Sequence, residues 1–130
     1  MTAIRDIEDA YIRRLTEMKD PLEQFDYLMA LGMKMGRAVS VEKDEFRIPE
    51  CRTAIWVRRE GSSFTASSDS MIVLGVLWIL RDMYDGRSRE EISANPMRFI
   101  DLISDYVLYP EIKKNGTKQV YLVLSSEKGE

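Results

Sequence analysis

Cys51 is the only cysteine in the chain, and the sequence contains no histidine. A closed zinc site needs three or four cysteine or histidine ligands, so such a site is excluded. Catalytic triads and dyads that use histidine as the base are excluded for the same reason. If the protein performs covalent chemistry on a thiol, Cys51 performs it, and a group other than an imidazole must activate the sulfur.

The residues beside Cys51 favour a loop. Pro49, Glu50 and Arg52 suit a connecting segment better than a core strand, although cysteine outside disulfides is often buried as a small hydrophobic side chain. Cys51 is therefore either a core residue or a reactive thiol on a loop. The second interpretation needs a mobile segment that delivers the thiol to a partner, and the polar stretch from Val39 to Glu50 is the candidate.

Composition limits the classes of function. The formal net charge is −3 and the pI about 5.2, which argues against nucleic-acid binding because that would require a basic surface. The first residues carry charge and no apolar segment of a signal peptide. The longest apolar stretch, Met71 to Leu80, is far shorter than the ~20 residues of a membrane span. One cysteine forms no internal disulfide. We expect a soluble cytoplasmic protein that binds neither nucleic acid nor membrane.

The pattern of apolar, capping and turn residues predicts an α+β fold, a small antiparallel sheet packed with several helices in one domain over residues 1–130. The expected elements are helices over 4–18 and 21–36, an exposed loop over 38–47, strands over 53–57 and 63–66, and helices over 71–84, 89–95 and 96–108.

Local signals set these boundaries. Asp20 and Pro21 suit a helix start, and Gly61 lies in the turn of the expected hairpin. The helix over 71–84 is apolar on nearly every side, which predicts a place at the centre of the domain, and Gly75 is expected to allow close helix packing there. The acidic run from Glu42 to Glu45 lacks the spacing of a calcium loop and is interpreted as solvated. The side chains expected to point inward from the second and last of these helices are Phe25, Leu28, Met29, Met33, Phe99, Ile100, Ile103 and Tyr106.

Several short motifs occur in a specific order. Leu31-Gly32 is followed by Cys51-x-x-x-Ile55-Trp56-Val57, then Phe64-Thr65-Ala66, Ser68-Asp69, Ile72-Val73-x-Gly75 and finally Tyr84-Asp85-Gly86-Arg87-Ser88. In this order and spacing, over roughly residues 20–116, the chain resembles the SufE family, the sulfur-acceptor partners of pyridoxal-phosphate cysteine desulfurases.

The resemblance implies a function and a site. A SufE-type protein accepts persulfide sulfur from the desulfurase on a loop cysteine, here Cys51, and passes it to scaffold proteins that build iron–sulfur clusters. It needs no cofactor of its own and acts as an accessory protein with a transferase-like half-reaction, not as a free-standing enzyme. The resemblance also implies a helix at the C-terminus, where the propensity of Val120 to Leu124 instead favours a strand.

The sequence departs from the family pattern around the cysteine. The family carries Gly-Cys-Gln-Ser where this chain has Glu50-Cys51-Arg52-Thr53. Glu50 removes the backbone freedom of a glycine and disfavours the thiolate, whereas the positive charge of Arg52 favours it. A family arginine near the C-terminus falls on Ile112 or, after a shift of one residue, on Lys113, which is the candidate for partner contact.

Two further residues match positions near the family's cysteine loop. Asp69 either supports that loop or serves only as a favourable acidic residue at a helix N-terminus. Trp56 either forms part of the apolar patch beneath the loop or is an ordinary core aromatic residue.

Three functions compete at this point. The first is the sulfur acceptor, and the second is a divergent docking or regulatory module that keeps the fold without carrying sulfur, an idea motivated by the altered residues around Cys51. The third is a redox-sensing thiol, which would need Cys51 to be exposed and low in pKa.

Overall fold

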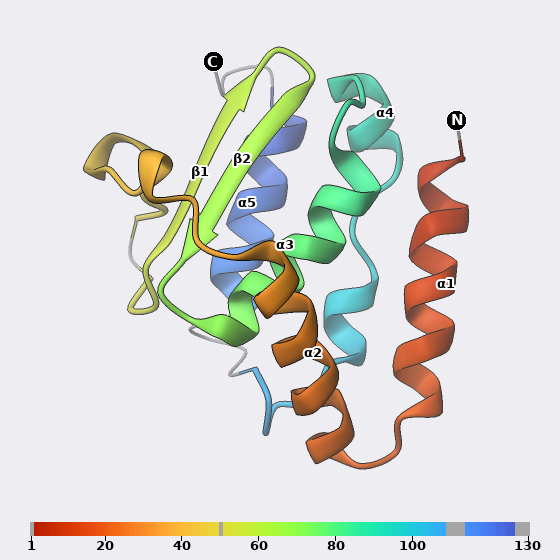
Figure 1. The fold of residues 1–130 in the computed structure, drawn as a ribbon. Helices are drawn as coiled ribbons and strands as arrows, with labels where there is room; N and C mark the ends of the chain where they lie inside the picture. The colour runs from red at the N-terminus through yellow and green to blue at the C-terminus, as the bar shows by residue number, and fades with distance from the viewer. Residues whose placement is uncertain (1, 50, 109–113, 127–130) are drawn as a thin grey trace.

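The helix α3, Met71–Tyr84, runs through the centre of the molecule (Figure 1). The structure is a computed structural model and describes residues 2–49, 51–108 and 114–126. Ten of the fourteen residues of α3 are buried, as expected for a helix that is apolar on nearly every side. Its N-terminus is capped by Ser70, whose Oγ accepts a hydrogen bond of 3.4 Å from the backbone N–H of Val73, so the prediction of a helix over 71–84 is confirmed.

The other elements surround α3. Its neighbours are α1, α2, β2 and α5, and Figure 1 shows the hairpin and α5 on one side of it and α1 on the other. The remaining bounds are α1 Ile4–Glu17, α2 Pro21–Met35, the 3-10 turns η1 Val39–Val41 and η2 Asp44–Phe46, β1 Ile55–Glu60, β2 Ser63–Ser68, α4 Arg89–Ala94, the 3-10 turn η3 Phe99–Leu102, and α5 Asn115–Ser125.

Helices α2 and α3 approach each other backbone to backbone. A Cβ on Gly75 would lie 2.2 Å from the carbonyl oxygen of Leu28, and a Cβ on Gly32 would lie 2.1 Å from that of Met71. Both positions therefore exclude any side chain, which confirms that Gly75 permits close helix packing. Helix α2 starts as predicted, because Asp20 accepts a hydrogen bond of 2.9 Å from the backbone N–H of Leu22, and it is followed by Gly36 at φ +65°.

The two strands form the predicted antiparallel hairpin. Ile55 pairs with Ser68 and Glu60 with Ser63, so the strands are longer than the sequence indicated. Gly61 occupies the turn at φ +62°, a conformation that glycine adopts without steric cost. A helical majority with one small antiparallel sheet confirms the α+β fold class.

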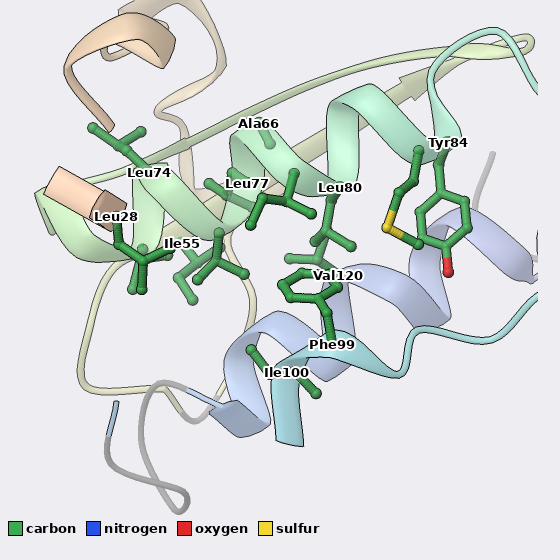
Figure 2. Close-up of a cluster of buried hydrophobic side chains, with 14 of the residues drawn as sticks. Leu28, Ile55, Ala66, Leu74, Leu77, Leu80, Tyr84, Phe99, Ile100 and Val120 are labelled. Carbon is green, nitrogen blue, oxygen red and sulfur yellow. The ribbon is translucent and has the colours of Figure 1, made fainter. Parts of the chain in front are cut away.

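The core lies where α3, α5, η3 and the hairpin meet. Figure 2 shows Leu77 and Leu80 of α3 together with Phe99 of η3 and Val120 of α5 in this cluster. All four side chains are at most 1% exposed, and burial of such residues is the main favourable term in folding. No helix in the described parts of the chain has the length and hydropathy needed to cross a membrane.

The prediction of a helix over 96–108 is wrong. Only Phe99–Leu102 forms a helical turn, and it is of the 3-10 type. The buried carboxylate of Glu8 accepts the backbone N–H groups of Arg98 and Phe99 at 2.6 and 3.1 Å, and Ser104 donates its N–H to the side chain of Gln24 at 2.8 Å. These tertiary hydrogen bonds replace the bonds that a continuous helix would make.

Three of the side chains expected to point inward are exposed. Tyr106 is 90% exposed. On α2 the buried residues are Gln24, Leu28, Leu31 and Gly32, whereas Phe25 is 40% and Met33 72% exposed. The close crossing at Gly32 turns the α2 face that carries Leu28 toward α3. At the C-terminus the helix implied by the resemblance is present as α5, and the strand favoured by propensity is not.

Candidate functional site

Cys51 lies between a segment that packs against β1 and the start of β1 itself. Before it, Ile48 donates its backbone N–H to the carbonyl of Ile55 at 2.8 Å. After it, the carbonyl of Ala54 accepts hydrogen bonds from the Ser68 hydroxyl at 2.7 Å and from the Asp69 backbone N–H at 3.3 Å. Both flanks of the cysteine are therefore held by the hairpin.

The sulfur of Cys51 packs against the first turn of α5. A Cβ placed on Gly116 would lie 2.8 Å from Sγ of Cys51 and 2.6 Å from Cδ1 of Ile55. Cys51 is 8% exposed and belongs to the hydrophobic core cluster. The absence of a side chain at Gly116 is what leaves room for the thiol in this position.

A surface pocket opens beside the cysteine. It has a volume of about 590 Å³ and is lined by Asp44, Arg47, Ile48, Pro49, Cys51 and Arg52. Pockets of this size suit a small molecule or an inserted side chain of a partner. The thiol is thus largely buried yet borders a cavity that solvent or another protein can enter.

Burial raises the pKa of the Cys51 thiol. A backbone hydrogen bond from Thr53 and the positive charge of Arg47 lower that pKa, and the negative charge of Asp69 raises it further. The balance favours the protonated thiol, which is a poor nucleophile. A redox sensor needs an exposed thiol of low pKa, so this interpretation loses support.

The segment before the cysteine is anchored to β2. Arg37 forms two hydrogen bonds to the carboxylate of Glu42, at 2.9 and 2.6 Å. The hydroxyl of Ser67 donates to the same carboxylate at 2.7 Å and accepts the backbone N–H of Ala38 at 3.0 Å. Val41 is 1% exposed. The expectation of an exposed loop over 38–47 holds for most of its residues, but Val41 is buried and Ala38 and Glu42 are bonded to Ser67 of the hairpin.

Among the predicted site residues that the structure describes, Cys51 and Arg52 line this pocket and Trp56 and Asp69 do not. Arg52 is exposed and lines the pocket with Cys51. Trp56 lies on β1, half-buried, and its backbone pairs with Arg47. Asp69 has an exposed side chain whose negative charge raises the pKa of the Cys51 thiol, and its backbone N–H donates to the carbonyl of Ala54. Glu50 and Lys113 lie outside the described residues.

Two residues that belong to the site were not singled out from the sequence. Arg47 is the cation that lowers the pKa of the thiol. It lies shortly before Cys51 on an irregular segment, so the sequence does not show that its charge lies near the thiol. Gly116 provides the space for the sulfur. Sequence patterns alone do not show what this glycine contacts.

Within residues 2–49, 51–108 and 114–126 no three cysteine, aspartate or glutamate side chains are grouped to hold an ion.

Comparisons with known proteins agree with the resemblance. A search of curated proteins gives no significant match. The family model described as "SufE: Fe-S metabolism associated domain" matches residues 9–125. This match covers nearly the whole chain and includes Cys51, the hairpin, α3 and α5. The chain therefore belongs to the SufE family, whose domain is associated with iron–sulfur metabolism.

Proposed function

We propose that this protein accepts sulfur from a pyridoxal-phosphate cysteine desulfurase on Cys51 and passes it on for iron–sulfur cluster assembly. The observation that carries the proposal is the position of Cys51 in a SufE domain, with its thiol bordering a surface pocket between Arg47 and Arg52. The protein would act as an accessory carrier in the cytoplasm, with the desulfurase and a cluster scaffold as its protein partners.

The reaction is a thiol exchange. The Cys51 thiolate attacks the outer sulfur of the desulfurase persulfide, a new S–S bond forms on Cys51, and the S–S bond of the donor breaks to release the donor's cysteine as a thiolate. The thiol proton of Cys51 leaves before the attack. No redox partner is consumed, because one persulfide replaces another.

The resting geometry protects the thiol and keeps it unreactive. Burial against Gly116 and Ile55 raises the pKa of Cys51, so the protonated form prevails until the sulfur leaves this contact. Once the thiol turns toward the pocket, burial no longer disfavours the thiolate, and Arg47 and Arg52 are near enough to line its surroundings. A partner that draws the cysteine out therefore also activates it.

Transfer of radiolabelled sulfur from L-cysteine tests this proposal. In the presence of a cysteine desulfurase, the label is expected on the wild-type protein and not on Cys51→Ser. Stable binding to the desulfurase without label on Cys51 would contradict the carrier role and favour the docking module.

Two arginine variants separate the contributions of the charges. Arg47→Ala removes the cation that lowers the pKa of the thiol and is expected to slow labelling. Arg52→Ala removes the other cation that lines the pocket, which is not among the charges that act on the resting thiol, and is expected to slow labelling less. Equal and unchanged rates in both variants would show that neither charge assists transfer.

A further inference from the structure

A second groove lies between α1, α2 and α3, and shares no residue with the thiol pocket. Its volume is about 630 Å³, within the range of sites that bind small molecules. The side chains that matter for recognition are Tyr11, Tyr27, Lys34, Trp78, Arg81 and Asp82. An adjoining pocket of about 500 Å³ shares Tyr11, Tyr27 and Asp82 and adds Arg14. The proposed sulfur transfer uses none of these residues.

Two aromatic rings that line this groove each have a guanidinium group over them. Arg81 lies 6.0 Å from the ring centroid of Trp78, and Arg14, from the adjoining pocket, lies 5.5 Å from that of Tyr27. Both rings are partly buried against the core. Aromatic rings with guanidinium groups form a surface on which a planar ring stacks while an attached anion meets the cations.

The carboxylates of the groove accept hydrogen bonds from within the fold, whereas two of its cations form no ion pair among the described residues. Asp82 accepts a hydrogen bond of 2.6 Å from the Tyr11 hydroxyl, and Asp85 accepts one of 3.1 Å from the backbone N–H of Phe64. By contrast, no carboxylate among the described residues lies within 4.0 Å of the charged groups of Lys34 or Arg81. The carboxylates thus have donors within the fold, and the two cations have capacity left for an acidic ligand.

The hydrogen bond from Tyr11 to Asp82 also has a structural role, since it joins α1 to α3. This role accounts for two of the residues that line the groove and not for the partly buried rings of Tyr27 and Trp78 or for the cations Lys34 and Arg81. We propose that the groove binds a small anion that carries a planar aromatic ring, with the ring against Trp78 and Tyr27 and the anionic group between Lys34 and Arg81.

Nuclear magnetic resonance of the full chain tests the proposal. The sequence has two tryptophans, Trp56 on β1 and Trp78 in the groove, so the indole N–H signal of Trp78 reports on the groove and that of Trp56 on a position outside it, and Trp56→Phe assigns them. The probes are AMP and indole-3-acetate, which both join a planar ring to an anion. We expect saturable shifts at Trp78 and none at Trp56. Adenosine and ribose 5-phosphate, which lack the anion and the planar ring respectively, should bind at least about tenfold more weakly.

Charge-removing variants supply the second part of the test. Lys34→Met and Arg81→Met are expected to weaken binding about tenfold or more, since each removes a charged hydrogen-bond donor. Lys43→Met, an exposed lysine outside the groove, should bind like the wild type. The proposal is overturned if neither probe shifts Trp78, if adenosine binds as well as AMP, or if both groove variants keep wild-type affinity.

Discussion

The sulfur of Cys51 occupies space that exists only because residue 116 is glycine. A Cβ at Gly116 would lie 2.8 Å from Sγ, closer than nonbonded atoms of this kind approach. The cysteine segment and α5 therefore meet at a contact that fixes the resting position of the thiol. This contact explains why the thiol of Cys51 is buried although the same residue lines a surface pocket.

Gly116→Ala is expected to displace the thiol toward the pocket. The Cβ would also meet Cδ1 of Ile55 at 2.6 Å, so a side chain on each side must move, and Cys51 lies on an irregular segment that can yield. We predict a several-fold faster alkylation of Cys51 by iodoacetamide under native conditions. Lys118→Ala, an exposed change on the same helix, is the matched control. An unchanged alkylation rate in Gly116→Ala would show that the glycine does not restrain the thiol.

The raised pKa of Cys51 predicts a distinctive pH profile. Burial raises this pKa, and Asp69 adds to the effect against Thr53 and Arg47. The alkylation rate of the native protein should keep rising with pH after that of the denatured chain has levelled off. A profile that levels off at lower pH than the denatured chain would mean that the fold favours the thiolate.

The same pKa shift affects stability. The folded protein binds the thiol proton more tightly than the unfolded chain does, so this contribution to stability is fully present below the unfolded pKa of the thiol. It is lost as the pH rises through the folded pKa. The unfolding free energy of the wild type, measured by urea titration, should therefore fall relative to that of Cys51→Ala as the pH rises through this alkaline range. A difference that does not change with pH would contradict the raised pKa.

Ser67 is expected to anchor the segment before the cysteine. Its hydroxyl is fully buried and bonds both Glu42 and the backbone of Ala38. Ser67→Ala removes a hydrogen-bond partner from two partly exposed polar groups and should lower the unfolding free energy by about 0.5–1.5 kcal/mol. Ser63→Ala, at an exposed position of the same strand, should change it little. Equal stabilities of the two variants in urea titration would show that the anchor is unimportant.

Gly75→Ala tests the helix crossing at the centre of the fold. The Cβ would lie 2.2 Å from the backbone carbonyl oxygen of Leu28, so a whole helix must move and overpacking should cost about 1–3 kcal/mol or more. Met33→Ala, on the exposed face of α2, is expected to leave the thermal midpoint nearly unchanged. A Gly75→Ala protein as stable as the wild type would contradict this packing of α2 on α3.

Local signals predicted the elements whose ends are fixed by their own residues. The cap at Asp20 and the turn at Gly61 lie where the sequence indicated, because each depends on residues close together in the chain. The prediction of a helix over 96–108 failed for the opposite reason. Its backbone donors bond Glu8 and Gln24, which are distant in sequence, and no local pattern reveals these partners.

In the candidate site, too, one residue could be identified from the sequence and others only from the fold. Cys51 could be found from the sequence because it is the only cysteine and because the surrounding motifs resemble a family. Arg47 and Gly116 required the fold, since the first acts through its position beside the pocket and the second through a contact between the cysteine segment and α5. The buried position of the thiol also follows from tertiary packing alone.

Intact-mass spectrometry after incubation with a cysteine desulfurase and L-cysteine tests the central claim most directly. The account predicts that the wild-type protein gains the mass of one sulfur atom, that a thiol reductant reverses the gain, and that Cys51→Ser shows none. A wild-type protein that binds the desulfurase and gains no sulfur, or a Cys51→Ser protein that gains it equally, would contradict the assignment of Cys51 as the sulfur acceptor.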